Sequence, residues 1–281
     1  MAETPVLGVA SWNIDAATLP DRVEWIVAHE FTAISLHVDV MDCEPSERAE
    51  AAAAVRDAGL VVTFHGVVGY DESAQVDWDR FERIMAEVVW WQEQTKNVYS
   101  LCYDPMFVAT DEGGKRFDPP ANREVLLATA ERLEPHGVRV GIENTYGGRG
   151  FCSIAELAAF LDSCERPTLG MLLDTGHANI HVRSGGVKGE ADVGEFVHAI
   201  PFDVLEVHFS DNHGETDEHL PLGAGNVDLR AVLGALKRKG FDGVLTVEVC
   251  PGLKARRLDV PEEMDQILRT RDAIAETWAE V

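Results

Sequence analysis

The chain has 281 residues, and its 24 Lys and Arg against 49 Asp and Glu give a formal net charge of −25. A field of this sign repels phosphate backbones and anionic membranes, so we expect neither a nucleic-acid nor a membrane partner. Hydrophobic residues make up 46% of the chain, which is enough for a large core. Adaptation to salt is a second explanation of the acidity.

The N-terminal sequence Met-Ala-Glu-Thr-Pro contains neither a basic nor an apolar segment, so it predicts no secretory signal. No apolar run approaches the ~18 residues needed to span a bilayer. The cysteines are odd in number and form no Cys-x-x-Cys pair, which is typical of reduced thiols in a cytoplasmic protein. They are Cys43, Cys102, Cys152, Cys164 and Cys250.

Strand-like and helix-like segments alternate along the whole chain. Apolar, β-branched runs predict strands, and apolar residues at helical spacing predict helices. In chain order, the expected strand and helix of each unit are 6–12 and 19–29, 33–38 and 45–58, 60–65 and 78–94, 98–103 and 122–135, 138–143 and 153–163, 169–174 and 193–199, 204–209 and 229–239, and 244–249 and 261–279. Gly59 after the second helix and Ser153 before the fifth are the expected caps.

Eight strand–helix units predict an α/β fold whose parallel sheet closes into a single (β/α)8 TIM barrel. We expect one domain over residues 1–281, because no linker or low-complexity tract interrupts the pattern. The longest loops, 104–121, 177–192 and 210–227, all follow strands. They are therefore expected at the active face of the barrel, where they would act as lids.

Ionisable side chains end the last four expected strands. Glu143, Asp174, His208 and Glu248 each follow an apolar run. A single carboxylate at a strand end is usually a cap or a solvated group. Four such groups at the same end of successive barrel strands converge on one mouth, which favours a divalent-metal site. Oxygen donors with one imidazole nitrogen suit Mn²⁺, Mg²⁺ or Co²⁺ better than they suit a metal that prefers thiolate ligands.

Further polar and aromatic residues are candidates for substrate binding. His177 either polarises a substrate oxygen or is a satisfied loop residue. Asp217 and His219 are two residues apart, so in extended backbone their side chains point the same way. They would bind a second metal, contact the substrate, or support the loop and the ligands. His65 ends the third strand and faces either the mouth or the core, and Trp12 is either a wall of a sugar pocket or part of the core.

The glycine-rich segments do not indicate a nucleotide. Gly223-Ala-Gly225 and Gly147-Gly148-Arg149-Gly150 match neither a P-loop nor a Rossmann fingerprint. We therefore expect no nucleotide cofactor.

Several motifs, taken in order, carry a family resemblance. They are Gly-Ile-Glu143-Asn, Leu-Asp174-Thr-Gly-His177, Val-His208-Phe-Ser-Asp, His219-Leu-Pro-Leu-Gly-Ala-Gly and Val-Glu248. The set resembles the xylose isomerase-like barrel superfamily, and within it the sugar phosphate isomerase/epimerase family, which includes ketose 3-epimerases and inosose dehydratases. The resemblance spans most of the chain and implies a dimer or a tetramer.

The resemblance also implies a site. Glu143, Asp174, His208 and Glu248 would bind one divalent metal, most often manganese, with magnesium, cobalt or zinc as alternatives. Glu143 and Glu248 would also transfer protons on opposite faces of a substrate carbon, and His177 would contact a substrate oxygen. The expected enzyme is a sugar isomerase or epimerase that acts on a ketose or related polyol ketone through a metal-stabilised enediolate. The same intermediate permits elimination, so a dehydratase or lyase acting on an inosose or keto-sugar stays open.

Two other functions also stay open. The superfamily contains endonuclease IV, a zinc phosphodiesterase, and His65, His177, Asp217 and His219 stand where that enzyme places zinc ligands. However, the fourth strand ends Leu-Cys-Tyr-Asp104-Pro without the expected His, and the net charge of −25 disfavours DNA. The other function is a non-catalytic sugar-binding subunit, which the presence of both glutamates disfavours.

The charge of the substrate follows less directly from the sequence. Cationic side chains in the expected mouth loops would hold a phosphate or a carboxylate, or they are solvated surface charges. They are Arg149, Arg183, Lys188 and Arg257. With the acidic field of the chain, we favour the solvated interpretation and a neutral sugar or inositol derivative as substrate.

Overall fold

The computed structural model describes residues 5–110, 114–146, 153–183, 192–250 and 260–281, with side chains from 264 onward in the last segment. Gly147, Gly148, Arg149, Gly150, Cys152, Lys188 and Arg257, considered above, lie outside the described residues. Cys43, Cys102 and Cys164 are free thiols. Among the described helices, none has a stretch long and apolar enough to cross a bilayer.

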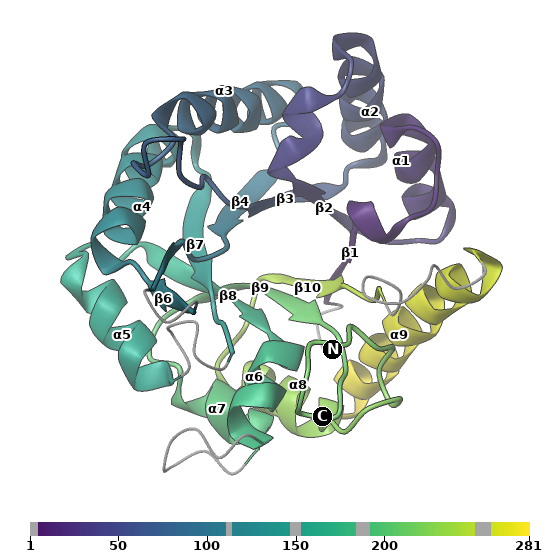
Figure 1. Ribbon diagram of the computed structural model, residues 1–281. Coiled ribbons are helices and arrows are strands. Elements are labelled where there is room, and N and C mark those ends of the chain that lie inside the picture. Colours follow the sequence, from purple (N-terminus) through teal and green to yellow (C-terminus); the bar gives the residue numbers. More distant parts are fainter. Residues whose placement is uncertain (1–4, 111–113, 147–152, 184–191, 251–259) are drawn as a thin grey trace.

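The parallel strands close into a barrel, in the order β1-β10-β9-β8-β7-β4-β3-β2 (Figure 1). They are β1 (Val6–Ala10), β2 (Ala33–His37), β3 (Val61–Gly66), β4 (Val98–Tyr103), β7 (Arg139–Glu143), β8 (Leu169–Asp174), β9 (Val204–Phe209) and β10 (Val244–Val247). The predicted (β/α)8 barrel is confirmed. All six residues of β8 and all six of β9 are buried, as expected where helices cover the outside and side chains fill the inside.

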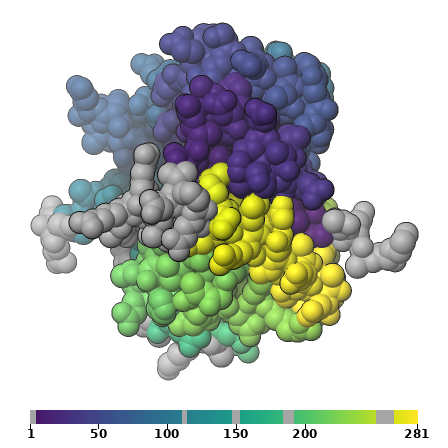
Figure 2. Space-filling model, turned by 90° about the vertical axis from the view of Figure 1, so that its right-hand side faces the viewer, coloured from purple at the N-terminus to yellow at the C-terminus, as the bar shows by residue number. Residues whose placement is uncertain are grey.

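Helices surround the barrel (Figure 1). They are α1 (Leu19–Ala28), α2 (Pro45–Ala58), α3 (Trp78–Thr95), α4 (Pro119–Leu133), α5 (Ile154–Ser163), α6 (Thr175–Arg183), α7 (Val193–Ala199), α8 (Leu229–Arg238) and α9 (Val260–Glu280). The last helix, α9, packs against α8 and β1, so it lies between the C-terminal and N-terminal parts of the ring (Figure 2).

Both expected caps are present. The Ser153 hydroxyl accepts a hydrogen bond from the Glu156 backbone N–H, and the Glu156 carboxylate accepts one from the Ser153 backbone N–H, which completes a capping box. Gly59 follows α2 at φ 69°, a left-handed conformation that glycine adopts without steric cost.

Two of the expected long loops contain regular structure. The segment 104–121 contains the antiparallel hairpin β5 (Phe107–Ala109) and β6 (Lys115–Phe117). The segment 177–192 was expected to be a loop. This prediction is wrong for residues 177–183, because α6 starts directly after β8 and includes them. The Asp174 carboxylate accepts the backbone N–H of His177 at 2.6 Å and so caps this helix. The third segment, 210–227, has only the isolated bridge between Asp211 and Leu220.

Several element ends differ from the expected ones. The first strand stops at Ala10, and a 3-10 turn η1 (Ser11–Asn13) carries Trp12. The helix expected from residue 122 begins at Pro119, because Asp118 caps it and proline suits the first helical positions. Two further 3-10 turns are η2 (Val38–Asp42) and η3 (Glu134–His136).

Candidate metal centre

The four proposed metal ligands come from neighbouring strands at one end of the barrel, here called the mouth. Glu143 ends β7, Asp174 ends β8, His208 is the fifth residue of β9, and Glu248 directly follows β10. Their exposed fractions are 3%, 0%, 0% and 9%, respectively. Groups with this burial require partners, because a charge removed from water is costly unless it is compensated.

These residues form overlapping clusters of possible ligand atoms. The atoms offered by Asp174, His208 and Glu248 lie within 4.8 Å of one another, and so do those of Glu143, Asp174 and His177. A third group contains His65, Glu143 and His208. Asp174 connects the first two groups, and Glu143 connects the second and third.

Several buried atoms of these clusters have no hydrogen-bond partner among the described residues. They include Oδ2 of Asp174, Nδ1 of His65 and both ring nitrogens of His208. Buried polar atoms are rarely left unsatisfied, and a divalent cation would satisfy Oδ2 of Asp174 and one ring nitrogen of His208. Carboxylate oxygens with imidazole nitrogen suit Mn²⁺, Mg²⁺, Co²⁺ or Zn²⁺, so the residues present fit a metal of this class.

Glu143 and Glu248 have pKa values shifted in opposite directions. Burial raises the pKa of Glu143 to about 7, although His177 partly opposes it. Burial also disfavours the charge of Glu248, but His208, 3.0 Å away, and His219 outweigh it and lower the pKa of Glu248 to about 2. In the metal-free protein near neutral pH, Glu143 is therefore partly protonated while Glu248 is a carboxylate.

His177 lies between two carboxylates. Its Nδ1 is 3.2 Å from Glu143 Oε1 and 3.0 Å from the backbone oxygen of Asn144, and its Nε2 is 3.5 Å from Asp217 Oδ2. Burial alone would lower the pKa of His177, but the charges of Asp174 and Glu143 raise it well above its ordinary value. A charged imidazole held here is a donor to an oxygen placed at the mouth.

Asp217 and His219 lie side by side, although not for the expected reason. His219 has φ 48°, so the backbone between them is not extended as expected. The side chains still meet, with Asp217 Oδ2 3.1 Å from His219 Nε2. The other ring nitrogen of His219 is 3.4 Å from the backbone oxygen of Glu248, so the pair borders the proposed ligands.

The loop that carries Asp217 and His219 is organised by a buried carboxylate. Asp211 has an exposed fraction of 0% and accepts four backbone N–H groups at 2.8–3.0 Å. The donors are Asn212, Gly223, Gly225 and Val227. A Cβ at Gly225 would lie 2.4 Å from Asp211 Oδ1, so only glycine allows this approach.

Trp12, in the turn that follows β1, lies against three imidazoles. Its ring stacks on His65 at 6.0 Å and is 6.1 Å from His208 and 5.9 Å from His37. His65 Nε2 is 3.4 Å from Asp104 Oδ1, and the carboxylates of Asp104 and Glu143 outweigh burial and raise the pKa of His65 to about 9. Trp12 and His65 therefore border the proposed metal ligands and do not belong to a separate apolar core.

Three further residues of the mouth, Asn144, Asp104 and Asp211, had no role predicted from the sequence. Asn144 accepts the Asp174 N–H at 2.8 Å and donates to the Asp174 backbone oxygen at 3.1 Å, so it holds the ends of β7 and β8 together. Its position directly after Glu143 was the available signal. Asp104 and Asp211 also directly follow strand ends or lie close to them, but their partners are distant in sequence and could not be inferred.

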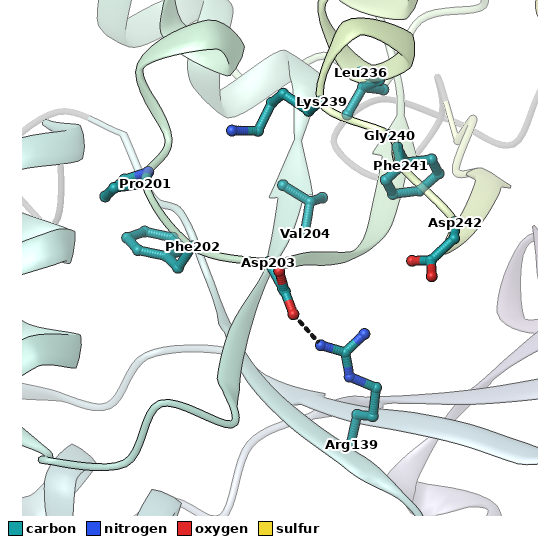
Figure 3. A pocket seen from close by; sticks show the side chains of 10 residues that line it. All are labelled: Arg139, Pro201, Phe202, Asp203, Val204, Leu236, Lys239, Gly240, Phe241 and Asp242. Atoms are coloured by element: carbon teal, nitrogen blue, oxygen red, sulfur yellow. Dashed lines mark hydrogen bonds and ion pairs between the residues drawn. The ribbon is translucent and has the colours of Figure 1, made fainter.

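A cavity of about 300 Å³ lies at the opposite end of the barrel (Figure 3). It is lined by the first residues of β7 and β9 and by the turn before β10. Its arginine, Arg139, pairs with Asp203 at 2.5 Å, and Lys239 donates to the backbone oxygen of Ile200 at 2.5 Å. Because these cations are already engaged and the proposed ligands lie at the far end, we place the functional site at the mouth.

The fold and the mouth define a class: an eight-stranded α/β barrel with carboxylates and imidazoles at the C-terminal ends of its strands. The sequence profile described as xylose isomerase-like TIM barrel matches residues 23–271. The chain belongs to this family.

Curated relatives match part of the chain. An uncharacterised protein of Methanocaldococcus jannaschii is 33% identical over 129 residues, which are 45% of this chain and 42% of that protein. A ketose 3-epimerase of Arthrobacter globiformis is 30% identical over 121 residues, or 42% of this chain and 37% of that enzyme. The matched region therefore spans less than half the length of either relative.

Solved structures match over nearly the whole chain. An L-ribulose 3-epimerase superimposes with a TM-score of 0.74 at 18% identity, covering 98% of this chain and 95% of that one. A D-tagatose 3-epimerase-like protein superimposes with a TM-score of 0.72 at 20% identity, covering 96% and 98%. At these identities the likeness shows the fold alone.

Proposed function

We propose that this protein is a divalent-metal-dependent sugar isomerase or epimerase that acts on a ketose or a related polyol ketone. The observation that carries the proposal is the pair Glu143 and Glu248. Their strands, β7 and β10, flank the strands of Asp174 and His208, so the two carboxyl groups stand on either side of the other proposed ligands. Two carboxyl groups placed in this way are suited to act as acid and base in one site. The ketose 3-epimerases among the relatives and solved structures support the choice of substrate class.

The proposed reaction moves a proton at the carbon next to a carbonyl. One of the two glutamates removes this proton, and the other returns it from the opposite face, which inverts the carbon. The charged imidazole of His177 donates to a substrate oxygen, and Trp12 provides an apolar wall for the carbon chain. A divalent cation held by Glu143, Asp174, His208 and Glu248 would supply Lewis-acid stabilisation of the negative charge on the substrate oxygens.

Further parts of the proposal rest on the resemblance and on charge. The metal is proposed to be manganese, and the protein a cytoplasmic dimer or tetramer without a nucleotide cofactor. The substrate is proposed to be a neutral sugar or polyol, because the chain carries a net charge of −25.

The first test is the metal content of protein purified without chelator, followed by proton exchange. Manganese at about one per chain is expected, and the protein should incorporate deuterium from heavy water into a ketose substrate. Glu143→Gln and Glu248→Gln should each lower this exchange by orders of magnitude, since loss of one acid–base group alone costs about 10²–10⁴-fold. Glu82→Gln, which affects only an exposed ion pair with Arg132, is the matched control.

A near-normal exchange rate in either glutamine variant would reject the assigned proton transfer. Metal binding without any exchange across a panel of ketoses and inososes would instead indicate a sugar-binding subunit. Exchange followed by loss of a β-hydroxyl would make the protein a dehydratase.

A zinc phosphodiesterase remains a second candidate because of one observation. His65, Glu143 and His208 form a further ligand group, so the mouth has donors for more than one ion. Two or three zinc ions per chain together with nicking of abasic DNA would favour it. The end of β4 argues against it, because Asp104 approaches His65 where an additional imidazole was expected.

A further inference from the structure

Glu206 is a buried carboxylate that the proposed reaction does not use. It stands two residues before His208 on β9, so both side chains point to the same face of the strand. Its exposed fraction is 0%. A carboxylate within an apolar strand costs free energy unless donors compensate its charge, so its partners indicate its role.

Two hydroxyl groups hold the Glu206 carboxylate. Its Oε1 accepts hydrogen bonds from Thr246 Oγ1 at 2.6 Å and from Thr63 Oγ1 at 2.8 Å. Thr246 is on the neighbouring strand β10, whereas Thr63 is on β3, which stands opposite β9 in the strand order. The carboxylate is therefore inside the barrel, fixed between opposite walls.

The same carboxylate oxygen lies close to His208. The Nε2 atom of His208 is 3.4 Å from Glu206 Oε1, and the Nδ1 atom is 3.0 Å from Glu248 Oε2. Both are ion-pair contacts without hydrogen-bond geometry. The two ring nitrogens thus face different carboxylates, with Nδ1 toward the proposed ligands and Nε2 toward Glu206. A neutral imidazole carries one proton, and the nitrogen that binds a metal must be the unprotonated one.

We propose that Glu206 is a positioning residue, which accepts the Nε2 proton of His208 and thereby presents Nδ1 as the metal-binding atom. This inference rests on the proposed function, in which His208 is a metal ligand. Carboxylates that hold the second N–H of a ligand histidine fix its tautomer and ring orientation, and their loss lowers metal affinity by about 10–100-fold.

The first experiment is a calorimetric Mn²⁺ titration of the chelator-treated full chain. Glu206→Leu, which removes the acceptor, should weaken binding by about 10–100-fold. Glu206→Gln should weaken it less, because an amide oxygen still accepts the proton. Ser100→Ala is the matched control, because Ser100 is another fully buried polar residue of the barrel, on β4. The Mn²⁺ affinity of this variant should equal that of the unsubstituted protein. Unchanged affinity in Glu206→Leu, or an equal loss in Ser100→Ala, would overturn the proposal.

A second experiment uses no metal. Nitrogen-15 NMR of histidine-labelled, metal-free protein should show an Nε2–H resonance of His208 shifted downfield by the carboxylate, and Glu206→Gln should move it upfield. This measurement decides the question even if Glu206→Leu does not fold. Normal Mn²⁺ binding by the unsubstituted chain with an unmoved resonance in Glu206→Gln would overturn the role of Glu206 alone. Absence of Mn²⁺ binding by the unsubstituted chain would overturn the proposed function and the role of Glu206 with it.

Discussion

Burial alone does not set the charge of the side chains at the barrel mouth. It raises the pKa of Glu143, whose neighbours only partly oppose it, and it is outweighed at Glu248 by two imidazoles. At His65 and His219, burial would lower the pKa, but neighbouring carboxylates favour the charged imidazole and raise the pKa instead. The mouth is thus a network of alternating carboxylates and imidazoles, in which the local pairing decides where each proton resides.

This pairing predicts how the stability of the metal-free protein depends on pH. The pKa values of His65 and His219 are raised to about 9 in the folded protein, from about 6.5 in an unfolded chain. The folded state binds these protons more tightly, so their stabilisation is complete below about pH 6.5 and is lost as the pH rises through about 9. For His65 alone the loss is on the order of 3 kcal/mol. We expect the urea midpoint of chelator-treated protein to fall between about pH 6.5 and 9.

His65→Gln provides the control for that experiment. The substitution removes one of the titrating histidines, so the free energy of unfolding of the variant should decrease less steeply over the same pH range. Identical slopes for the variant and the unsubstituted protein would show that His65 does not gain its proton on folding.

At the level of elements, sequence periodicity was sufficient to predict the strands and helices of the barrel, but not the structure of the loops between them. The eight strands and the main helices follow from apolar runs and caps such as Ser153. In contrast, α6 has no separate apolar run, because it starts where β8 ends and is capped by Asp174, a residue assigned to the metal. The capping oxygen is Oδ1, which leaves Oδ2 for the proposed metal, and a sequence shows only that the carboxylate exists.

The 210–227 loop is the element that places Asp217 and His219, and it depends on Asp211. Asp211→Ala would leave four backbone N–H groups, one buried and three partly buried, without their acceptor. An unsatisfied buried donor costs about 1–3 kcal/mol, and water can replace part of the loss at the other three, so we expect a loss of about 1–3 kcal/mol in the free energy of unfolding. Urea denaturation at neutral pH measures this loss, and a rise in KM for the substrate would accompany it.

Asp71→Ala is a matched control for this loop. Asp71 also accepts two backbone N–H groups, from Ser73 and Gln75, but it is exposed, so water replaces the lost acceptor. Its effect should be much smaller than that of Asp211→Ala. Comparable losses in both variants would contradict the idea that the buried carboxylate organises the loop.

At the scale of the whole molecule, the sequence predicted that ionisable groups would gather at one end of the barrel, but not which would touch. The register of the strands and the closure of the barrel bring Glu143 and Glu248 to one mouth, although three strand–helix units separate them along the chain. The contacts of Trp12 with three imidazoles, and of Thr63 with Glu206 across the barrel, depend on the closed geometry. Such contacts join residues with no relation in sequence spacing, so no local pattern predicts them.

The net charge of −25 also belongs to this scale, because it acts on the folded molecule as a whole. Self-repulsion is greatest in the compact state, so added salt should stabilise the protein by screening. We expect the thermal midpoint to rise as KCl is increased from about 0.01 M to about 0.5 M.

If the acidity only prevents non-specific association, the rise should level off there, since the Debye length is already about 3 Å at 1 M. If the acidity reflects adaptation to salt, the midpoint should continue to rise at molar KCl. A midpoint independent of salt would contradict both explanations, because it would mean that the excess carboxylates do not repel one another in the folded chain.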